Sequence, residues 1–192
     1  RPEKRNPMNE EILLELEGLL HQIRDDAEVR VLILTGTGNT FSAGADLSQT
    51  KGITDPQERE RIFATYRQRR GRLVGRILHT LVHLEPITIA AVNGYAVAGG
   101  LERALACDIR IASENAQFGC FEIRRGIPNP PDPLIRLIGF GPALHMLLSG
   151  DIFNAEEALR FGLVTKVVPP SELMSTVEAL AQRMAEYPIE VL

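Results

Sequence analysis

Two glutamates, Glu102 and Glu122, are the side chains of this sequence best suited to moving protons. Two carboxyl groups in different environments can act as an acid and a base. Hydration of a double bond conjugated to a carbonyl group needs both, since a base takes a proton from water and an acid protonates the alpha carbon. Considered alone, each glutamate is also typical of a solvated surface, with Arg124 and Arg125 as surface partners of Glu122.

Two segments concentrate small residues immediately before a predicted helix, namely 41–47 (FSAGADL) and 94–102 (GYAVAGGLE). Backbone N–H groups at a helix N-terminus are free, and the helix dipole adds positive potential there. If both ends face one pocket, they form an oxyanion hole, a pair of N–H groups that binds developing negative charge. Spacing alone favours the simpler interpretation, two glycine-rich turns.

Hydrophobic periodicity predicts alternating helices and strands. Asn6 and Pro7 predict the cap and first residue of an initial helix, and Asp55-Pro56 opens a long one that Glu85-Pro86 ends. Strands are predicted at 31–35, 87–92, 107–113 and 163–168, and further helices at 101–106, 132–149, 154–161 and from Ser171. This order indicates an α/β fold. No linker divides the chain, so we expect one domain over 1–192.

The composition is that of an ordinary globular protein, 44% hydrophobic and 24% charged. A net charge of −4 is opposite to that of general nucleic-acid binders. No apolar run approaches the roughly 20 residues that cross a bilayer. We therefore expect a cytoplasmic protein that binds neither membranes nor nucleic acid. Cys107 and Cys120 favour buried free thiols, and neither they nor the four histidines have the spacing of metal ligands.

Four segments occur in a characteristic order: RPEKRNPMN, VRVLILTGTGNTFSAGADL, ITIAAVNGYAVAGGLERALACDIRIAS and AQFGCFEIRRGI. They resemble the crotonase family, also called the enoyl-CoA hydratase/isomerase family. The resemblance extends from Arg1 to Leu192 and includes the later segment LLSGDIFNAEEALRFGLVTKVVP. It implies a crotonase-like fold in which ββα units repeat to form a spiral. We expect the natural protein to extend past both ends, with C-terminal helices that build trimers in the family.

The resemblance also implies roles for individual residues. The N–H groups of Ala45 and Gly99 would form the oxyanion hole, and Glu102 and Glu122 would be the catalytic pair of the family's hydratases. The residues expected to bind substrate and CoA are Ala43, Gly44, Ala45, Asp46, Leu47, Ser48 and Gly99. The implied reaction hydrates a 2-enoyl-CoA thioester to a 3-hydroxyacyl-CoA through an enolate. It needs no metal and no cofactor besides the CoA of the substrate, and the implied assembly is a homotrimer or a dimer of trimers.

Other activities of the family stay open. An isomerase needs one carboxylate, usually at the Glu122 position, while a hydratase-lyase or a CoA hydrolase are further alternatives. A relative that has lost catalysis could bind RNA, because fold does not determine function. Seven arginines on the long helix bear on this question: Arg59, Arg61, Arg67, Arg69, Arg70, Arg72 and Arg76. We interpret them as a solvated face, partly paired with Glu58 and Glu60, from which some could reach CoA phosphates.

Two features depart from the family pattern. Four prolines in 128–133 replace flexible glycines, so we expect a stiffer loop near the acyl pocket and an altered acyl specificity. Arg103 follows Glu102 where small or apolar residues are common. It is either a surface residue or a charge that lowers the pKa of a neighbouring carboxylate.

Overall fold

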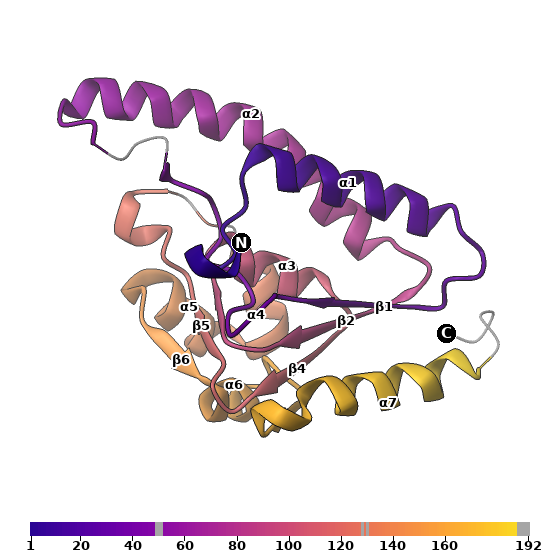
Figure 1. Ribbon diagram of the computed structural model, residues 1–192. Coiled ribbons are helices and arrows are strands. Elements are labelled where there is room, and N and C mark those ends of the chain that lie inside the picture. Colours follow the sequence, from indigo (N-terminus) through magenta and orange to yellow (C-terminus); the bar gives the residue numbers. More distant parts are fainter. Residues whose placement is uncertain (49–51, 128, 130, 188–192) are drawn as a thin grey trace.

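The computed structural model describes residues 1–48, 52–127, 129 and 131–187, without the side chains at 59, 62, 63, 65–67 and 69 (Figure 1). Its helices are α1 (Glu10–Arg24), α2 (Pro56–Val82), α3 (Gly99–Ala106), α4 (Asp132–Ile138), α5 (Phe140–Ser149), α6 (Ala155–Phe161) and α7 (Leu173–Ala185). Its strands are β1 (Val31–Thr35), β2 (Ile87–Val92), β3 (Tyr95–Val97), β4 (Ile109–Ser113), β5 (Gln117–Gly119), β6 (Ile152–Asn154) and β7 (Lys166–Val168). Short 3-10 turns occur at Pro2–Lys4, Ile123–Arg125 and Pro170–Glu172.

The described strands form two sheets. The larger is parallel throughout, in the order β1-β2-β4-β7, and the smaller has the order β3-β5-β6. A strand of the larger sheet is followed directly by one of the smaller sheet and then by helical residues, first in β2-β3-α3 and again from β4 and β5 to the turn Ile123–Arg125. These repeated ββα units confirm the expected crotonase-like α/β architecture.

The larger sheet is covered on both faces because successive strand residues point to opposite sides. In β2, Ile89 and Ala91 pack with Val177 of α7, whereas Ala90 and Val92 belong to the core that includes Leu101 of α3. Figure 1 shows α7 on the opposite side of this sheet from α1 and α2. Burial on both faces explains why β2 reads as one continuous apolar run rather than an alternating one.

The long helix α2 lies beside α1 (Figure 1). Leu13 and Leu20 of α1 pack against Leu73, Ile77 and Leu81 of α2 in one apolar cluster. Arg76 Nε donates to Glu17 Oε1 of α1 over 2.6 Å, so this arginine pairs across the helices and not with Glu58 or Glu60. The side chains of Arg59, Arg67 and Arg69 lie outside the described residues.

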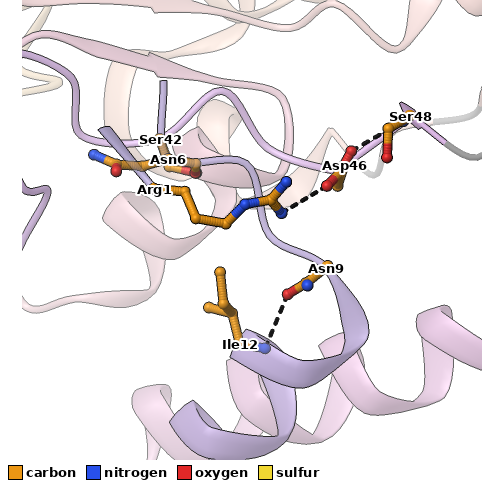
Figure 2. A network of polar contacts seen from close by, with 7 residues as sticks. All are labelled: Arg1, Asn6, Asn9, Ile12, Ser42, Asp46 and Ser48. Carbon is orange, nitrogen blue, oxygen red and sulfur yellow. Dashed lines mark hydrogen bonds and ion pairs between the residues drawn. The ribbon is translucent and has the colours of Figure 1, made fainter. Parts of the chain in front are cut away.

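The prediction that Asn6 and Pro7 begin the first helix is wrong. Asn9 is the cap, and its side chain accepts a hydrogen bond from Ile12 N over 3.0 Å (Figure 2). Asn6 instead donates to Thr37 O and Thr40 O over 2.8 and 2.6 Å. The helix starts late because Met8 pairs with Ala45 in a parallel bridge, which requires an extended backbone there.

Other boundaries shift for local reasons. The predicted strand at 107–113 begins at Ile109, since Cys107 caps α3. The predicted strand at 163–168 is formed only by β7, because the N–H groups of Leu163 and Val164 bond to Ala158 O at the end of α6. A 3-10 turn over Pro170–Glu172 delays the last helix to Leu173.

Candidate functional site

The segment 42–46 is held between two extended neighbours. Ser42 N donates to Tyr95 O over 2.9 Å, and Val97 N donates to Ser42 O over 3.1 Å, which attaches the segment to β3. On its other side, Met8 N donates to Gly44 O over 2.8 Å and Asp46 N to Met8 O over 3.0 Å. In such a parallel bridge the residues flanking Ala45 make the bonds, so the N–H of Ala45 itself points away from Met8.

Gly99 approaches this segment from the N-terminus of α3. Gly44 has a positive φ of +83°, and a Cβ added to it would lie 2.9 Å from Gly99 N. As the first residue of α3, Gly99 has an N–H without a partner in the helix. Within the described part of the chain, the N–H groups of Ala45 and Gly99 have no hydrogen-bond acceptor. Both residues line one cavity of about 230 Å³.

The turn into α3 is strained at Ala98, whose φ of +51° and ψ of −131° are unusual for a residue with a Cβ. Two hydrogen bonds hold this conformation, from Ala98 N to Gly119 O over 2.9 Å and from Glu102 N to Ala98 O over 3.1 Å. This conformation, in which Ala98 precedes the first turn of α3, is the one that places the Gly99 N–H at the cavity.

Both predicted carboxylates line the same cavity as Ala45 and Gly99. Glu102 is on the first turn of α3, and a methyl group added to Gly99 would lie 3.6 Å from Glu102 Oε2. Glu122 follows β5 at the start of the turn Ile123–Arg125. The fold therefore brings together the four groups singled out in the sequence, which are the N–H groups of Ala45 and Gly99 and the carboxyl groups of Glu102 and Glu122.

Glu122 is buried, with 8% of its surface exposed, so its interpretation as a surface residue is wrong. Its Oε2 has no hydrogen-bond partner among the described residues. Burial raises the pKa of the Glu122 carboxyl group, and the charge of Glu102 adds to this, although a hydrogen bond with its own backbone and one with Asn129 oppose it. A proton on this carboxyl group is consequently easier to retain than on an exposed glutamate.

A second cavity of about 160 Å³ adjoins the first, and Ala98 and Glu102 line both. Its walls are mainly leucine, formed by Leu78, Leu101, Leu105 and Leu134, with Cys120 and Pro133. Pro133 and Asn129 come from the proline-rich loop, so its described residues do lie next to an apolar pocket. Pro128 and Pro130 lie outside the described residues. Both cysteines are buried free thiols, as expected, and burial raises the pKa of each to about 12.

Asp46 braces the segment from outside the cavity (Figure 2). Its carboxylate accepts hydrogen bonds from Arg1 Nη1 over 2.6 Å and from Ser48 N over 2.9 Å. Partial burial raises the pKa of Asp46, but the bonds from Ser48 and the charge of Arg1 outweigh it and hold the pKa at about 2. Ala43, Ala45 and Leu47 line the cavity, whereas Gly44, Asp46 and Ser48 are absent from its described walls.

Sequence reasoning missed the wall that α2 supplies. Arg70, Gly71 and Val74 line the larger cavity, so Arg70 does not belong to a purely solvated face. Gly71 and Val74 follow Arg70 by one and four residues, a spacing that places these residues on one face of a helix. The high arginine content of this helix concealed that pattern. Arg125 of the turn Ile123–Arg125 also lines this cavity, together with Phe121 before the turn and Ile127 after it.

Among the described residues, no three His, Cys, Asp or Glu side chains are grouped so as to hold a metal ion. None of the described helices combines the length and the apolar character that crossing a bilayer requires.

The site of this α/β domain combines two free backbone N–H groups and two carboxyl groups around one cavity. This is the kind of enzyme site that can bind a carbonyl oxygen and move protons beside it. A profile of the family described as enoyl-CoA hydratase/isomerase matches residues 1–192. The chain belongs to this family.

Individual relatives agree with this assignment. The short-chain-enoyl-CoA hydratase of Clostridium acetobutylicum is 42% identical over 188 residues, which are 96% of this chain and 69% of that protein. The crystal structure of an enoyl-CoA hydratase from Bacillus anthracis has a TM-score of 0.86 at 35% identity, covering 98% of this chain and 71% of that one. A monofunctional enoyl CoA isomerase from M. smegmatis has a TM-score of 0.79 at 34% identity, covering 99% and 79%.

Proposed function

We propose that the protein hydrates 2-enoyl-CoA thioesters to 3-hydroxyacyl-CoA products. The observation that carries this proposal is the shared cavity of Ala45, Gly99, Glu102 and Glu122, which unites both oxyanion donors with two carboxyl groups. The hydratase names of the similar proteins support the same reaction.

The thioester oxygen binds to the N–H groups of Ala45 and Gly99. Glu102, as carboxylate, takes a proton from water while the water oxygen bonds to C3, and the C2=C3 electron pair moves onto the thioester to give an enolate. The enolate returns its electrons to C2, which takes a proton from Glu122. Proton exchange with solvent then restores both glutamates. This division of labour follows from burial, because the raised pKa of Glu122 favours its protonated form.

The two cavities suit the two parts of the substrate. The leucine-rich cavity beside Glu102 would receive the acyl chain. The segment Ala43–Ser48 would face the pantetheine and adenine parts of CoA, and Arg125 on the wall of the larger cavity could approach the negative charges of CoA. A homotrimer or dimer of trimers stays a prediction from the resemblance, and a cytoplasmic location stays a prediction from the composition of the sequence.

An isomerase is the second candidate, and a specific observation favours it. Glu122 is buried, and its Oε2 has no hydrogen-bond partner among the residues that the structure describes, as suits a single carboxyl group that shuttles a proton between two carbons. The similarity to an enoyl CoA isomerase adds to this. The position of Glu102 in both cavities favours hydration, because an isomerase has no use for a second carboxylate there.

The test follows the loss of conjugated thioester absorbance with crotonyl-CoA and identifies the products. We expect Glu102→Gln and Glu122→Gln each to lower kcat by about 100- to 10,000-fold. The control is Glu114→Gln, which changes an exposed glutamate after β4 and should retain full activity. Loss of activity in Glu122→Gln alone, with a shifted double bond in 3-enoyl-CoA and no water uptake, would establish the isomerase instead.

A further inference from the structure

Arg103 places a buried positive charge directly beside the proposed oxyanion hole. Its side chain is fully buried, so its interpretation as a surface residue is wrong. Nη1 donates a hydrogen bond to Gly99 O, one turn earlier on α3. Nε and Nη2 are buried and have no hydrogen-bond partner among the described residues. Burial and the nearby charge of Arg70 lower the pKa of Arg103 to about 10, although Glu102 opposes this, so the group stays charged at neutral pH.

A second arginine that is buried among the described residues, Arg110, makes the contacts expected of a structural role. Its Nε donates to Leu163 O over 2.8 Å, its Nη1 to Cys107 O over 2.5 Å and its Nη2 to Asp108 O over 3.4 Å. Arg110 thus connects β4 to the ends of α3 and α6. Within the part of the chain that the structure describes, Arg103 makes its hydrogen bond only inside its own helix turn. A buried charge with few partners is unfavourable for folding, so stability does not account for Arg103.

The charge of Arg103 lies close to the proposed oxyanion hole. A methyl group added to Gly99 would lie 3.1 Å from Arg103 Nη1 and 3.8 Å from Gly44 Cα, so the guanidinium adjoins the residue that supplies one oxyanion donor. Arg103 is absent from the described walls of the cavity, whereas Gly99 lines it, so Gly99 lies between the guanidinium and the cavity. Because the charge is buried, solvent and salt screen it weakly.

We propose that Arg103 is a positioning residue that strengthens the oxyanion hole through Gly99, by adding a full positive charge to the field of the α3 N-terminus. The inference rests on the proposed function in that the negative charge it stabilises is the thioester enolate. The electric field of the Arg103 guanidinium adds to that of the free N–H groups. Both fields stabilise the negative charge that develops on the thioester oxygen during the reaction. The charged groups nearest to it are Arg70 and Glu102, and Arg125 and Glu122 lie on the same cavity.

Acetoacetyl-CoA tests the field directly. It loses a C2 proton to solvent and forms an enolate with a distinct near-ultraviolet absorbance, and the pH midpoint of this change in the bound ligand reports the potential at the hole. We expect Arg103→Met to raise the midpoint by about one to two pH units and Arg103→Lys, which keeps the charge, to change it by less than about 0.5. With crotonyl-CoA, Arg103→Met should lower kcat by about 10- to 100-fold and change KM by less than about threefold.

Thermal unfolding separates this role from a structural one. Arg103→Met should leave Tm unchanged or raise it, because it removes a poorly partnered buried charge and its repulsion with Arg70. Arg110→Met should lower Tm, because it leaves several carbonyl groups without donors. An Arg103→Met protein that fails to fold, or that loses as much stability as Arg110→Met, would show that Arg103 is structural and would overturn the proposal.

An unchanged enolate midpoint in folded Arg103→Met would also overturn it. If that variant instead loses affinity for a thioester with a second carboxylate, such as glutaconyl-CoA, the guanidinium contacts substrate and is not a positioning residue. The two proposals can fail separately. Absence of crotonyl-CoA hydration by the unmodified protein refutes the hydratase function, whereas the midpoint of bound acetoacetyl-CoA tests Arg103 in either case.

Discussion

Replacing Gly44 by alanine tests whether the Gly99 N–H is part of a working oxyanion hole. The new methyl group would lie 2.9 Å from Gly99 N, 3.1 Å from Ala98 Cβ and 3.1 Å from Val97 O. These contacts involve mainly backbone atoms, which cannot move aside as a flexible side chain can. The methyl group would occupy the space next to the proposed donor, so the hole has to open or the thioester oxygen has to shift.

The expected magnitudes follow from the local geometry. Alanine at a φ of +83° costs about 1–2 kcal/mol, and overpacking at these distances adds about 1–3 kcal/mol. Alanine also lowers the conformational entropy of the unfolded chain, which stabilises the folded protein by about 0.4–1 kcal/mol. We therefore expect a net destabilisation of about 1–4.5 kcal/mol, or a fall in Tm of roughly 2–18 °C. Loss of one oxyanion donor should lower kcat by about 100- to 1,000-fold.

Gly162→Ala is the matched control. Gly162 has a similar φ of +80°, but its added methyl group would meet only Leu137 O, at 3.7 Å. It should lose about 1 kcal/mol of stability and keep its kcat. Circular dichroism melting and crotonyl-CoA turnover measure both effects. If folded Gly44→Ala retained kcat within about threefold, the Gly99 N–H would not be a principal donor and the proposed hole would be wrong.

Three further predictions concern single side chains. The raised pKa of Glu122 means that the native carboxyl group holds its proton above its ordinary pKa of 4.5, so stability falls with rising pH in that window. Urea titrations should therefore show Glu122→Gln more stable than the unmodified protein at neutral pH, and the difference should vanish below that ordinary value. Asp46 has its pKa lowered from 3.8 to about 2, so Asp46→Asn should be destabilising at neutral pH by about 1 kcal/mol. This loss of stability should shrink as pH falls through about 2. A loss of stability that does not depend on pH would contradict the role of the Arg1 contact. Gly18→Ala, at an open position inside α1, should raise stability by about 0.5–1 kcal/mol, and a lower Tm would show an unrecognised contact.

The elements that sequence reasoning located well carry strong local signals. Asp55-Pro56 begins α2 because Asp55 accepts a hydrogen bond from Gln57 N and Pro56 has no N–H to lose. Asn154 forms a capping box with Glu157, and Gly162 ends α6 at positive φ. In the site, Glu102 and Gly99 share one helix turn that follows a glycine-rich segment, but the roles given to them come from the family resemblance and stay predictions.

What the sequence could not reveal depends on contacts between remote segments. The strands β3, β5 and β6 have three residues each, too few to show a period of two. Asn6 has the chemistry of a helix cap, but the bridge between Met8 and Ala45 decides where the helix begins. Arg70 and Arg103 are ordinary helix residues by propensity, and only the packing of α2 beside α3 makes one a cavity wall and the other a buried charge.

The bridges around Ala45 also determine when the site comes into existence during folding. Contacts of Met8 with Ala45, Ser42 with Ala96, and Ala98 with Gly119 join stretches that are between 21 and 54 residues apart, while α1 and α2 form from local contacts. Such long loops close late, because their entropy is lost before their contacts are gained. In stopped-flow refolding, helical ellipticity should thus return before turnover does. An incompletely folded chain with most of its helices would be catalytically silent, which protects CoA thioesters from a half-formed site.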